Sequence, residues 1–135
     1  VDNCTIYTKK KASYVTAAST IEGNEFGYVF INCNLTGDAD ANSVYLGRPW
    51  RPFAKTVYIN CAIDSTIKAE GWHNWSKSDA EKTTFYAEYN SKGAGADFSK
   101  RVSWSHQLTK EQSKKYTAKN ILKGTDNWNF KNSFK

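Results

Sequence analysis

The sequence predicts an all-β parallel solenoid, and three features of its 135 residues support that prediction. Cysteine recurs at positions 4, 33 and 61, at intervals of 29 and 28 residues. A strand-like segment surrounds each cysteine, and a second strand-like segment follows each of the first two. A constant period of this length is typical of stacked repeat architectures. We therefore expect about three coils, each built from one repeat.

The segment around each cysteine is expected to be the first strand of its coil. The three segments read DNCTI, INCNL and INCAI. Side chains alternate between the two faces of a strand, so the apolar residues of one segment should share a face. In the second and third coils these residues are Val29, Ile31, Cys33 and Leu35, and Val57, Ile59, Cys61 and Ile63. Each cysteine is then a small buried residue at the same rung of successive coils.

A second strand is expected later in each coil. SYVTA begins at Ser13 and SVYLG begins at Ser43, nine and ten residues after the preceding cysteines. In the third coil we expect the counterpart to be Thr83–Tyr89, delayed by the loop before it. Short strands of similar phase without hairpin signals favour parallel coils over a meander. A sandwich whose strands share this spacing by coincidence is the alternative.

The region after the coils has a different pattern. One domain is expected over the whole chain, with β-helix coils in residues 1–89 and a loop, a strand and short helices in residues 90–135. A capping box that starts at Thr109 predicts a short helix, and Thr117 is expected to cap a second helix that stops near Gly124. These helices should pack on the solenoid.

The stretch GRPWRP, residues 47–52, interrupts the second strand of the second coil. Strict alternation would place Arg48 in the core, where an unpaired guanidinium is very costly. Either Gly47 breaks the phase of the strand or Arg48 meets a carboxylate. Pro49 lacks an N–H donor and should end the strand. The turn would then display Arg48, which can grip a carboxylate, and Trp50, whose ring can stack on a sugar. An ordinary turn with a packed tryptophan is the alternative.

Composition excludes some classes of function and favours others. A net charge of +6 favours a polyanionic partner, such as nucleic acid, an anionic membrane or an acidic polysaccharide, although scattered lysines can also serve solubility alone. No apolar run is long enough to cross a membrane. The cysteines lack metal-ligand spacing and lie far from His73 and His106, so we expect no metal and no cofactor. The basic residues do not cluster with the aromatic ones, which disfavours nucleic acid as a partner.

Several stretches closely resemble the pectin methylesterase (pectinesterase) family, and the resemblance covers nearly the whole chain. They read GYVFINCNLTG, YLGRPWRPFAKTVYINC, GWHNW, TTFYAEYNSKGAGA and RVSWSHQLT. The resemblance implies a right-handed parallel β-helix, of which this chain would hold about three coils. It also implies hydrolysis of the methyl esters of polygalacturonate (pectin), a reaction that yields pectate and methanol without a cofactor.

The resemblance assigns roles to three residues. In the family, the arginine of the GRPW motif hydrogen-bonds the nucleophilic aspartate, and this role carries over to Arg48. The tryptophan of the same motif lines the substrate groove, which carries over to Trp50. The tryptophan that follows glycine in EGWHNW lines the groove as well, which carries over to Trp72.

The chain departs from the family pattern at the catalytic acids. The family's two aspartates lie in a Gln-Asp motif and an Asp-Phe-Ile-Phe-Gly motif, and neither motif occurs in this sequence. We therefore expect the chain to be the C-terminal part of a pectinesterase domain that is inactive by itself. No catalytic role is assigned to the aspartates that are present: Asp2, Asp38, Asp40, Asp64, Asp79, Asp97 and Asp126.

The expected partners and location follow from the same resemblance. The substrate would be pectin or oligogalacturonate, and no nucleic acid or membrane partner is expected. An exposed first coil would associate with the missing N-terminal part of the domain or with a second copy of the chain. The protein would be extracellular or in the cell wall, or periplasmic in a bacterium. A non-catalytic polysaccharide-binding solenoid is the alternative function.

Overall fold

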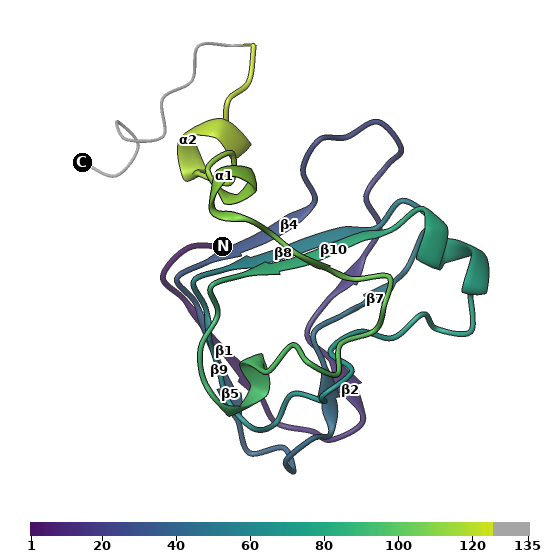
Figure 1. Ribbon diagram of the computed structural model, residues 1–135, viewed down its shortest axis with the longest axis vertical. Coiled ribbons are helices and arrows are strands. Elements are labelled where there is room, and N and C mark those ends of the chain that lie inside the picture. The colour runs from purple at the N-terminus through teal and green to yellow at the C-terminus, as the bar shows by residue number, and fades with distance from the viewer. Residues whose placement is uncertain (126–135) are drawn as a thin grey trace.

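The computed structural model describes residues 1–125, and its strands wind around a common interior (Figure 1). All strand pairs are parallel. The largest sheet contains, in spatial order, β11 (His106–Gln107), β10 (Phe85–Tyr89), β8 (Lys55–Ile59) and β4 (Tyr28–Ile31). The second sheet contains β1 (Thr5–Thr8), β5 (Asn34–Gly37) and β9 (Ala62–Ile63). Two strand pairs form the remaining sheets: β2 (Ser13–Tyr14) with β6 (Val44–Tyr45), and β3 (Ala17–Ala18) with β7 (Arg48–Pro49).

An asparagine in the left-handed conformation separates the first two strands of each coil. Asn32 divides β4 from β5 and Asn60 divides β8 from β9, each with φ 52°. Asn3 and Asn90 adopt nearly the same conformation in the neighbouring coils, with φ 52° and 50°. Asparagine enters this region of backbone space more readily than other residues with a Cβ. The turns stack along the solenoid, and Asn90 Nδ2 donates a hydrogen bond of 2.8 Å to Asn60 Oδ1.

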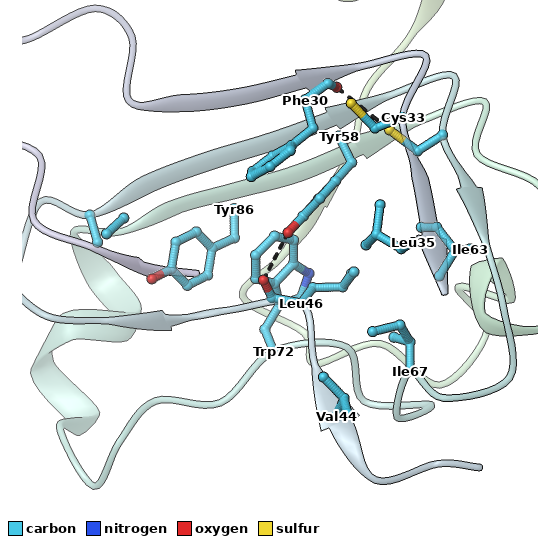
Figure 2. Close-up of a cluster of buried hydrophobic side chains, with 13 residues drawn as sticks. Phe30, Cys33, Leu35, Val44, Leu46, Tyr58, Ile63, Ile67, Trp72 and Tyr86 are labelled. Carbon is cyan, nitrogen blue, oxygen red and sulfur yellow. Dashed lines mark hydrogen bonds between the residues drawn. The ribbon is translucent and has the colours of Figure 1, made fainter. Parts of the chain in front are cut away.

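These turns correct the predicted alternation. The structure has two short strands on either side of each asparagine, and the turn changes which face of the chain looks inward. The interior therefore receives Phe30 and Tyr58, stacked at 4.7 Å, together with Cys33 (Figure 2). Val29 and Val57, predicted to share the cysteine's face, lie in a separate cluster on the outer face of the sheet. Burial of the cysteines is confirmed at Cys33 and Cys61, whereas Cys4 in the first coil is exposed.

The expected second strand of the third coil is also corrected. Thr83–Tyr89 was predicted to be the counterpart of the strand that starts at Ser43, but β10 instead pairs with β8, with Tyr89 opposite Ile59. It is the first strand of the next coil. The true counterparts are single bridges within the preceding loop, Val44 with Ile67 and Gly47 with Trp72. A single bridge involves one residue of the chain instead of a whole strand, so the sequence around it has no alternating pattern from which a strand could be predicted.

The helices follow the predicted caps. Thr109 and Gln112 form a reciprocal capping box at α1 (Lys110–Ser113), and the Thr117 side chain accepts from Asn120 N at α2 (Ala118–Ile121). The second helix ends before Gly124. Both helices lie over the outer face of the large sheet (Figure 1), where Tyr116 and Ile121 pack against the cluster that includes Val29 and Val57. Two 3₁₀ helices, η1 (Ser78–Lys82) and η2 (Ala94–Ala96), complete the described part of the chain, none of whose helices could cross a membrane.

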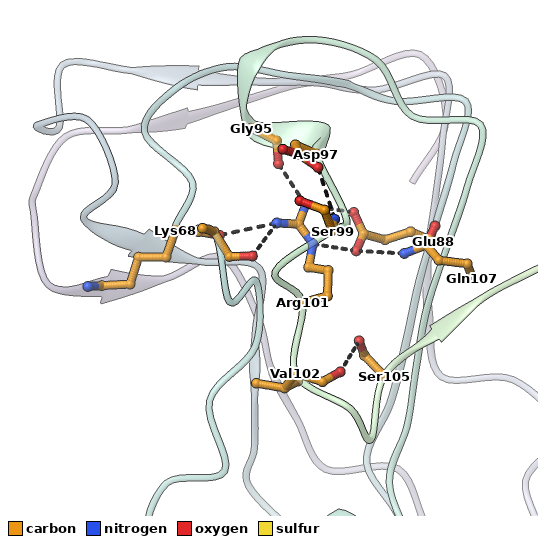
Figure 3. A network of polar contacts seen from close by, with 10 residues as sticks. Lys68, Glu88, Gly95, Asp97, Ser99, Arg101, Val102, Ser105 and Gln107 are labelled. Atoms are coloured by element: carbon orange, nitrogen blue, oxygen red, sulfur yellow. Dashed lines mark hydrogen bonds and ion pairs between the residues drawn. The ribbon is translucent and has the colours of Figure 1, made fainter.

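A buried ion pair closes the interior near its C-terminal end. Glu88 occupies the inward position of β10 in register with Tyr58, and Arg101 reaches it through Nε at 2.8 Å and Nη2 at 3.0 Å. The two side chains are only 3% and 4% exposed. Arg101 also donates to the carbonyl oxygens of Lys68, Ala69 and Gly95 (Figure 3). Burial of this pair is tolerated because the donors on both Arg101 terminal nitrogens and Nε find acceptors.

The left-handed turns lead to a prediction about stability. Replacing Asn60 by alanine should lower the free energy of unfolding by about 1–2 kcal/mol, because a Cβ without a polar group is disfavoured at positive φ. Asn60→Gly is the matched control, since it loses the same side-chain contact with Asn90 but has no Cβ. Urea denaturation measures both variants. Equal losses in the alanine and glycine variants would contradict the conformational explanation.

Candidate functional site

The chain changes sheets at the interruption that the sequence predicted. Val44 and Leu46 are fully buried, whereas Arg48 belongs to the next strand pair and is half-buried. Only glycine fits where the chain changes sheets, because a Cβ at position 47 would lie 2.2 Å from Thr16 Oγ1. The strand expected to run from Ser43 to Pro49 is divided into β6, which ends at Tyr45, and β7, so Arg48 lies in a short strand and not in the expected turn. Of the two expectations for Arg48, a phase break at Gly47 or a carboxylate partner, the structure shows the phase break.

Aromatic rings surround the guanidinium of Arg48. Its central carbon lies 4.0 Å from the centre of the Trp75 ring, 5.2 Å from that of Trp50 and 5.4 Å from that of Tyr14. At these distances a cation is attracted by the negative faces of the rings. The three rings come from three successive coils, so the stacking of the coils assembles the group.

The guanidinium itself has unused hydrogen-bonding capacity. Within residues 1–125, Nε and Nη1 of Arg48 are buried and make no hydrogen bond, and no ion pair joins Arg48 to a described carboxylate. The hydroxyl of Tyr86 is buried without a partner as well. Burial raises the pKa of Tyr86 well above its usual value, and the positive charge of Arg48 opposes this shift in part. Nε and Nη1 of Arg48 and the hydroxyl of Tyr86 are therefore three buried polar atoms without a hydrogen-bond partner among the described residues.

The structure separates the two tryptophans that were expected to line the groove. Trp50 is 57% exposed and lies beside Arg48 at the surface. Trp72 is only 1% exposed, stacked at 4.4 Å on Tyr86 inside the solenoid. Trp72 was expected to line the substrate groove; its bridge with Gly47 places it on the inner side of the third coil, where its ring is buried.

Trp75, to which the sequence analysis assigned no role, is the tryptophan of this segment that lies beside Arg48 at the surface. It is 44% exposed and covers Arg48. The signal was present in GWHNW, which holds two tryptophans three residues apart. The alternation of side chains along a strand could not show which of the two tryptophans is exposed, because Trp75 lies in a turn with φ 58° rather than in a strand.

Two tyrosines and a histidine extend the aromatic group along the coils. Tyr14 and Tyr45 pair in register and stack with ring centres 5.3 Å apart. The hydroxyl of Tyr14 lies 3.2 Å from Nδ1 of His73. The pKa of Tyr14 is raised, first by burial and then by Tyr45, while Arg48 opposes the shift. The phenol is therefore protonated at neutral pH and can donate this hydrogen bond.

The aspartates of the described residues serve local structure. Asp64 accepts hydrogen bonds from Thr66 N and Oγ1, and although burial raises its pKa, these and other hydrogen bonds lower it overall. Asp97 accepts from Ser99 N, and this bond lowers the pKa of Asp97. Asp126 lies outside the described residues. Residues 1–125 also contain no group of histidine, cysteine, aspartate and glutamate side chains that could hold a metal ion.

The contrast between the two tryptophans gives a testable prediction. Trp72→Ala should lower the free energy of unfolding by about 3–5 kcal/mol, because it removes a large ring from the core. Trp50→Ala should change stability by less than about 0.5 kcal/mol, because that ring is mostly in water. Thermal or urea unfolding of the two variants measures the difference. A small loss for Trp72→Ala would show that its ring is not a core residue.

Comparison with known proteins identifies the family. The family model for pectinesterase matches residues 1–125. Pectinesterase 31 of Arabidopsis thaliana is 36% identical over 113 residues, which are 83% of this chain and 35% of that protein. Pectinesterase 2 of Citrus sinensis is 34% identical over 137 residues, which cover 92% of this chain and 27% of the relative. The chain thus spans about a third or less of these relatives.

Solved structures agree with this result and with the predicted fold class. A pectin methylesterase from carrot superposes with a TM-score of 0.77 at 26% identity, covering 89% of this chain and 42% of the other. A pectin methylesterase in complex with a hexasaccharide gives 0.73 at 26% identity, covering 95% and 45%. The prediction of a right-handed parallel β-helix with short C-terminal helices is confirmed. The chain belongs to the pectinesterase family.

Proposed function

We propose that this chain is part of a pectin methylesterase that hydrolyses the methyl esters of polygalacturonate to pectate and methanol. In this proposal the chain supplies Arg48 and one wall of the substrate groove, and another segment supplies the catalytic aspartates. The observation that carries the proposal is the guanidinium of Arg48, whose buried Nε and Nη1 have no hydrogen-bond partner among residues 1–125. A carboxylate beside these donors would restore the hydrogen bonds that burial removes.

The chemistry assigns Arg48 a defined role in this reaction. A carboxylate that attacks an ester carbonyl must be ionised, and a neighbouring guanidinium lowers its pKa through charge and hydrogen bonds. The attack forms an acyl-enzyme and expels methanol, and water then releases the free acid. Trp50 contributes an exposed ring on which a galacturonate residue can stack. No aspartate among residues 1–125 pairs with Arg48, so in this proposal the aspartates that the chemistry needs come from another segment.

A second candidate is a polysaccharide-binding solenoid without catalysis. It is favoured by one specific observation: residues 1–125 contain the aromatic rings and the cation but no carboxylate that pairs with Arg48. The two candidates differ in a single measurement, which is the release of methanol.

The proposal includes a partner for the first coil. Tyr28 shares the inward face of β4 with Phe30 but is 51% exposed, because no coil covers it within residues 1–125. Strand β1 is an edge of its sheet, and the outer edge of β4 is covered only by Val1–Asn3, through the bridge between Asp2 and Ile31. An apolar end with a largely open strand edge associates readily with a further coil. We assign this end to the missing N-terminal part of the domain or to a second copy of the chain.

The location follows from the proposed substrate. Pectin is a polymer of cell walls, so the enzyme would act outside the cell or in the wall, or in the periplasm of a bacterium.

The 135-residue chain alone should release no methanol from methylated pectin, because no described aspartate is placed beside Arg48. Adding the N-terminal half of a related pectin methylesterase, which carries the two aspartate motifs, should produce methanol if the halves associate. In that mixture Arg48→Ala should lower turnover about a hundredfold or more, through the loss of charge-assisted hydrogen bonds. Turnover by the chain alone would place the nucleophile within it and overturn this division of roles. Binding of pectin without methanol in any mixture would favour the second candidate.

Binding of demethylated oligogalacturonate should weaken with salt. The chain carries a net charge of +6 and the ligand is a polyanion, so raising the ionic strength from a few millimolar to about 0.15 M, where the Debye length is about 8 Å, should lower the affinity severalfold. Isothermal titration at several salt concentrations measures this. The fully methylated oligomer is the control, because it is uncharged. An affinity for the charged ligand that does not respond to salt would remove electrostatics from the explanation.

A further inference from the structure

The turn that carries Trp75 has an unusual backbone. Trp75 and Ser76 are consecutive residues at φ 58° each, in the left-handed region. A single bulky residue there costs about 1–2 kcal/mol. Such a conformation persists only where the surroundings impose it, and it is found most often at functional sites.

Side chains from the same segment hold this backbone in place. The N–H of Trp75 donates to Nδ1 of His73 at 3.2 Å, and the N–H of Ser76 donates to Oδ1 of Asn74 at 2.9 Å. Because the backbone N–H can only donate, Nδ1 of His73 is the acceptor, and its single lone pair is shared between this N–H and the hydroxyl of Tyr14. Nδ2 of Asn74 is in turn fixed by Glu81 Oε1 at 2.7 Å. Each of the two strained residues thus has its own acceptor.

The turn is tied to the other side of the site as well. The ammonium of Lys77 donates to the carbonyl oxygen of Trp50 at 3.0 Å. The ring of Tyr14 lies edge-on to that of Trp75, with centres 5.5 Å apart. The position of the Trp75 ring is therefore set from three directions, by its own backbone, by Tyr14 and by the link to the turn at Trp50.

We infer that Trp75 is a positioning residue for Arg48. Its ring is the nearest of the three to the guanidinium, at 4.0 Å. A contact with an aromatic face attracts the cation without using any N–H donor, so the donors of Arg48 stay available for a carboxylate. The strained turn fixes the position of the Trp75 ring, and the ring fixes the guanidinium of Arg48. The free donors of the guanidinium can then bind the carboxylate of the proposed nucleophile. The inference that this geometry serves carboxylate binding rests on the proposed function, whereas the contact between Trp75 and Arg48 can be tested without it.

Nuclear magnetic resonance of the 135-residue chain tests the contact directly. Protons held over an aromatic face resonate upfield, so Arg48 Hε and Hδ should be shifted upfield in the unmodified chain. Trp75→Leu should remove the shift, and Trp75→Phe, which keeps a smaller aromatic face, should retain part of it. Arg48→Lys identifies the resonances. Phe98→Leu is the matched control, because Phe98 is an exposed aromatic residue, 60% accessible, outside the site.

The affinity for demethylated oligogalacturonate is measured on the same samples. Trp75→Leu should lower it about three- to tenfold, Trp75→Phe should restore much of the loss, and Phe98→Leu should leave it unchanged. Arg48 resonances that do not move in either Trp75 variant would overturn the inference. The inference would also be overturned if the Arg48 resonances move in Trp75→Leu while the affinity for demethylated oligogalacturonate stays that of the unmodified chain. If the unmodified chain binds no oligogalacturonate but the Arg48 shift still depends on Trp75, the positioning contact stands and the proposed function fails.

Discussion

A guanidinium taken out of water needs hydrogen-bond acceptors, and this molecule treats the buried guanidinium of Arg101 and the half-buried one of Arg48 in opposite ways. Arg101 has the Glu88 carboxylate and three carbonyl oxygens around it. Arg48 has rings on its faces, and its buried Nε and Nη1 have no acceptor within residues 1–125. An unpaired buried donor costs about 1–3 kcal/mol, and more for a charged group. The first arginine is explained by the stability of this chain, whereas the second leaves two donors available for an acceptor outside residues 1–125.

The geometry of the coils decides which residues can meet at Arg48. Register pairs Ala17 with Arg48 and Tyr14 with Tyr45, so side chains from the first and second coils lie at neighbouring heights. The bridge between Gly47 and Trp72 aligns the third coil with them and brings the turn at Trp75 over the guanidinium. The left-handed asparagines keep this register, because they place the bend between strands at the same point of every coil. The site is therefore a product of the repeat and cannot be moved independently of it.

The same repeat explains what could be predicted from sequence. Period and strand composition were sufficient for parallel coils and for buried Cys33 and Cys61, and the capping residues Thr109 and Thr117 were sufficient for the two helices. Alternation failed where Asn32 and Asn60 turn the chain, because a period of two assumes a continuous strand. It failed again in the third coil, where single bridges replace ladders.

The candidate site shows the same division between what a motif specifies and what packing decides. The GRPW motif was sufficient to predict a break in the strand before Arg48 and an exposed Trp50, because Gly47 and Pro49 act on the local backbone. The choice between Trp72 and Trp75 depends on which ring the third coil turns inward, and no local pattern encodes it. Trp72 fills the interior against Tyr86, and this leaves Trp75 as the ring that can reach the guanidinium.

The ends of the solenoid show why stability and function are linked in this fold. The C-terminal end is closed: Glu88 stands where the next inward side chain would be, and Arg101 covers it with a complete set of hydrogen bonds. The first coil instead leaves Tyr28 exposed on the inward side of β4. Arg48 and Tyr14 lie in the two coils nearest this open end. A coil that covered Tyr28 would add apolar burial and, in the same step, could bring a carboxylate within reach of Arg48. Assembly of the core and completion of the site would then be one event.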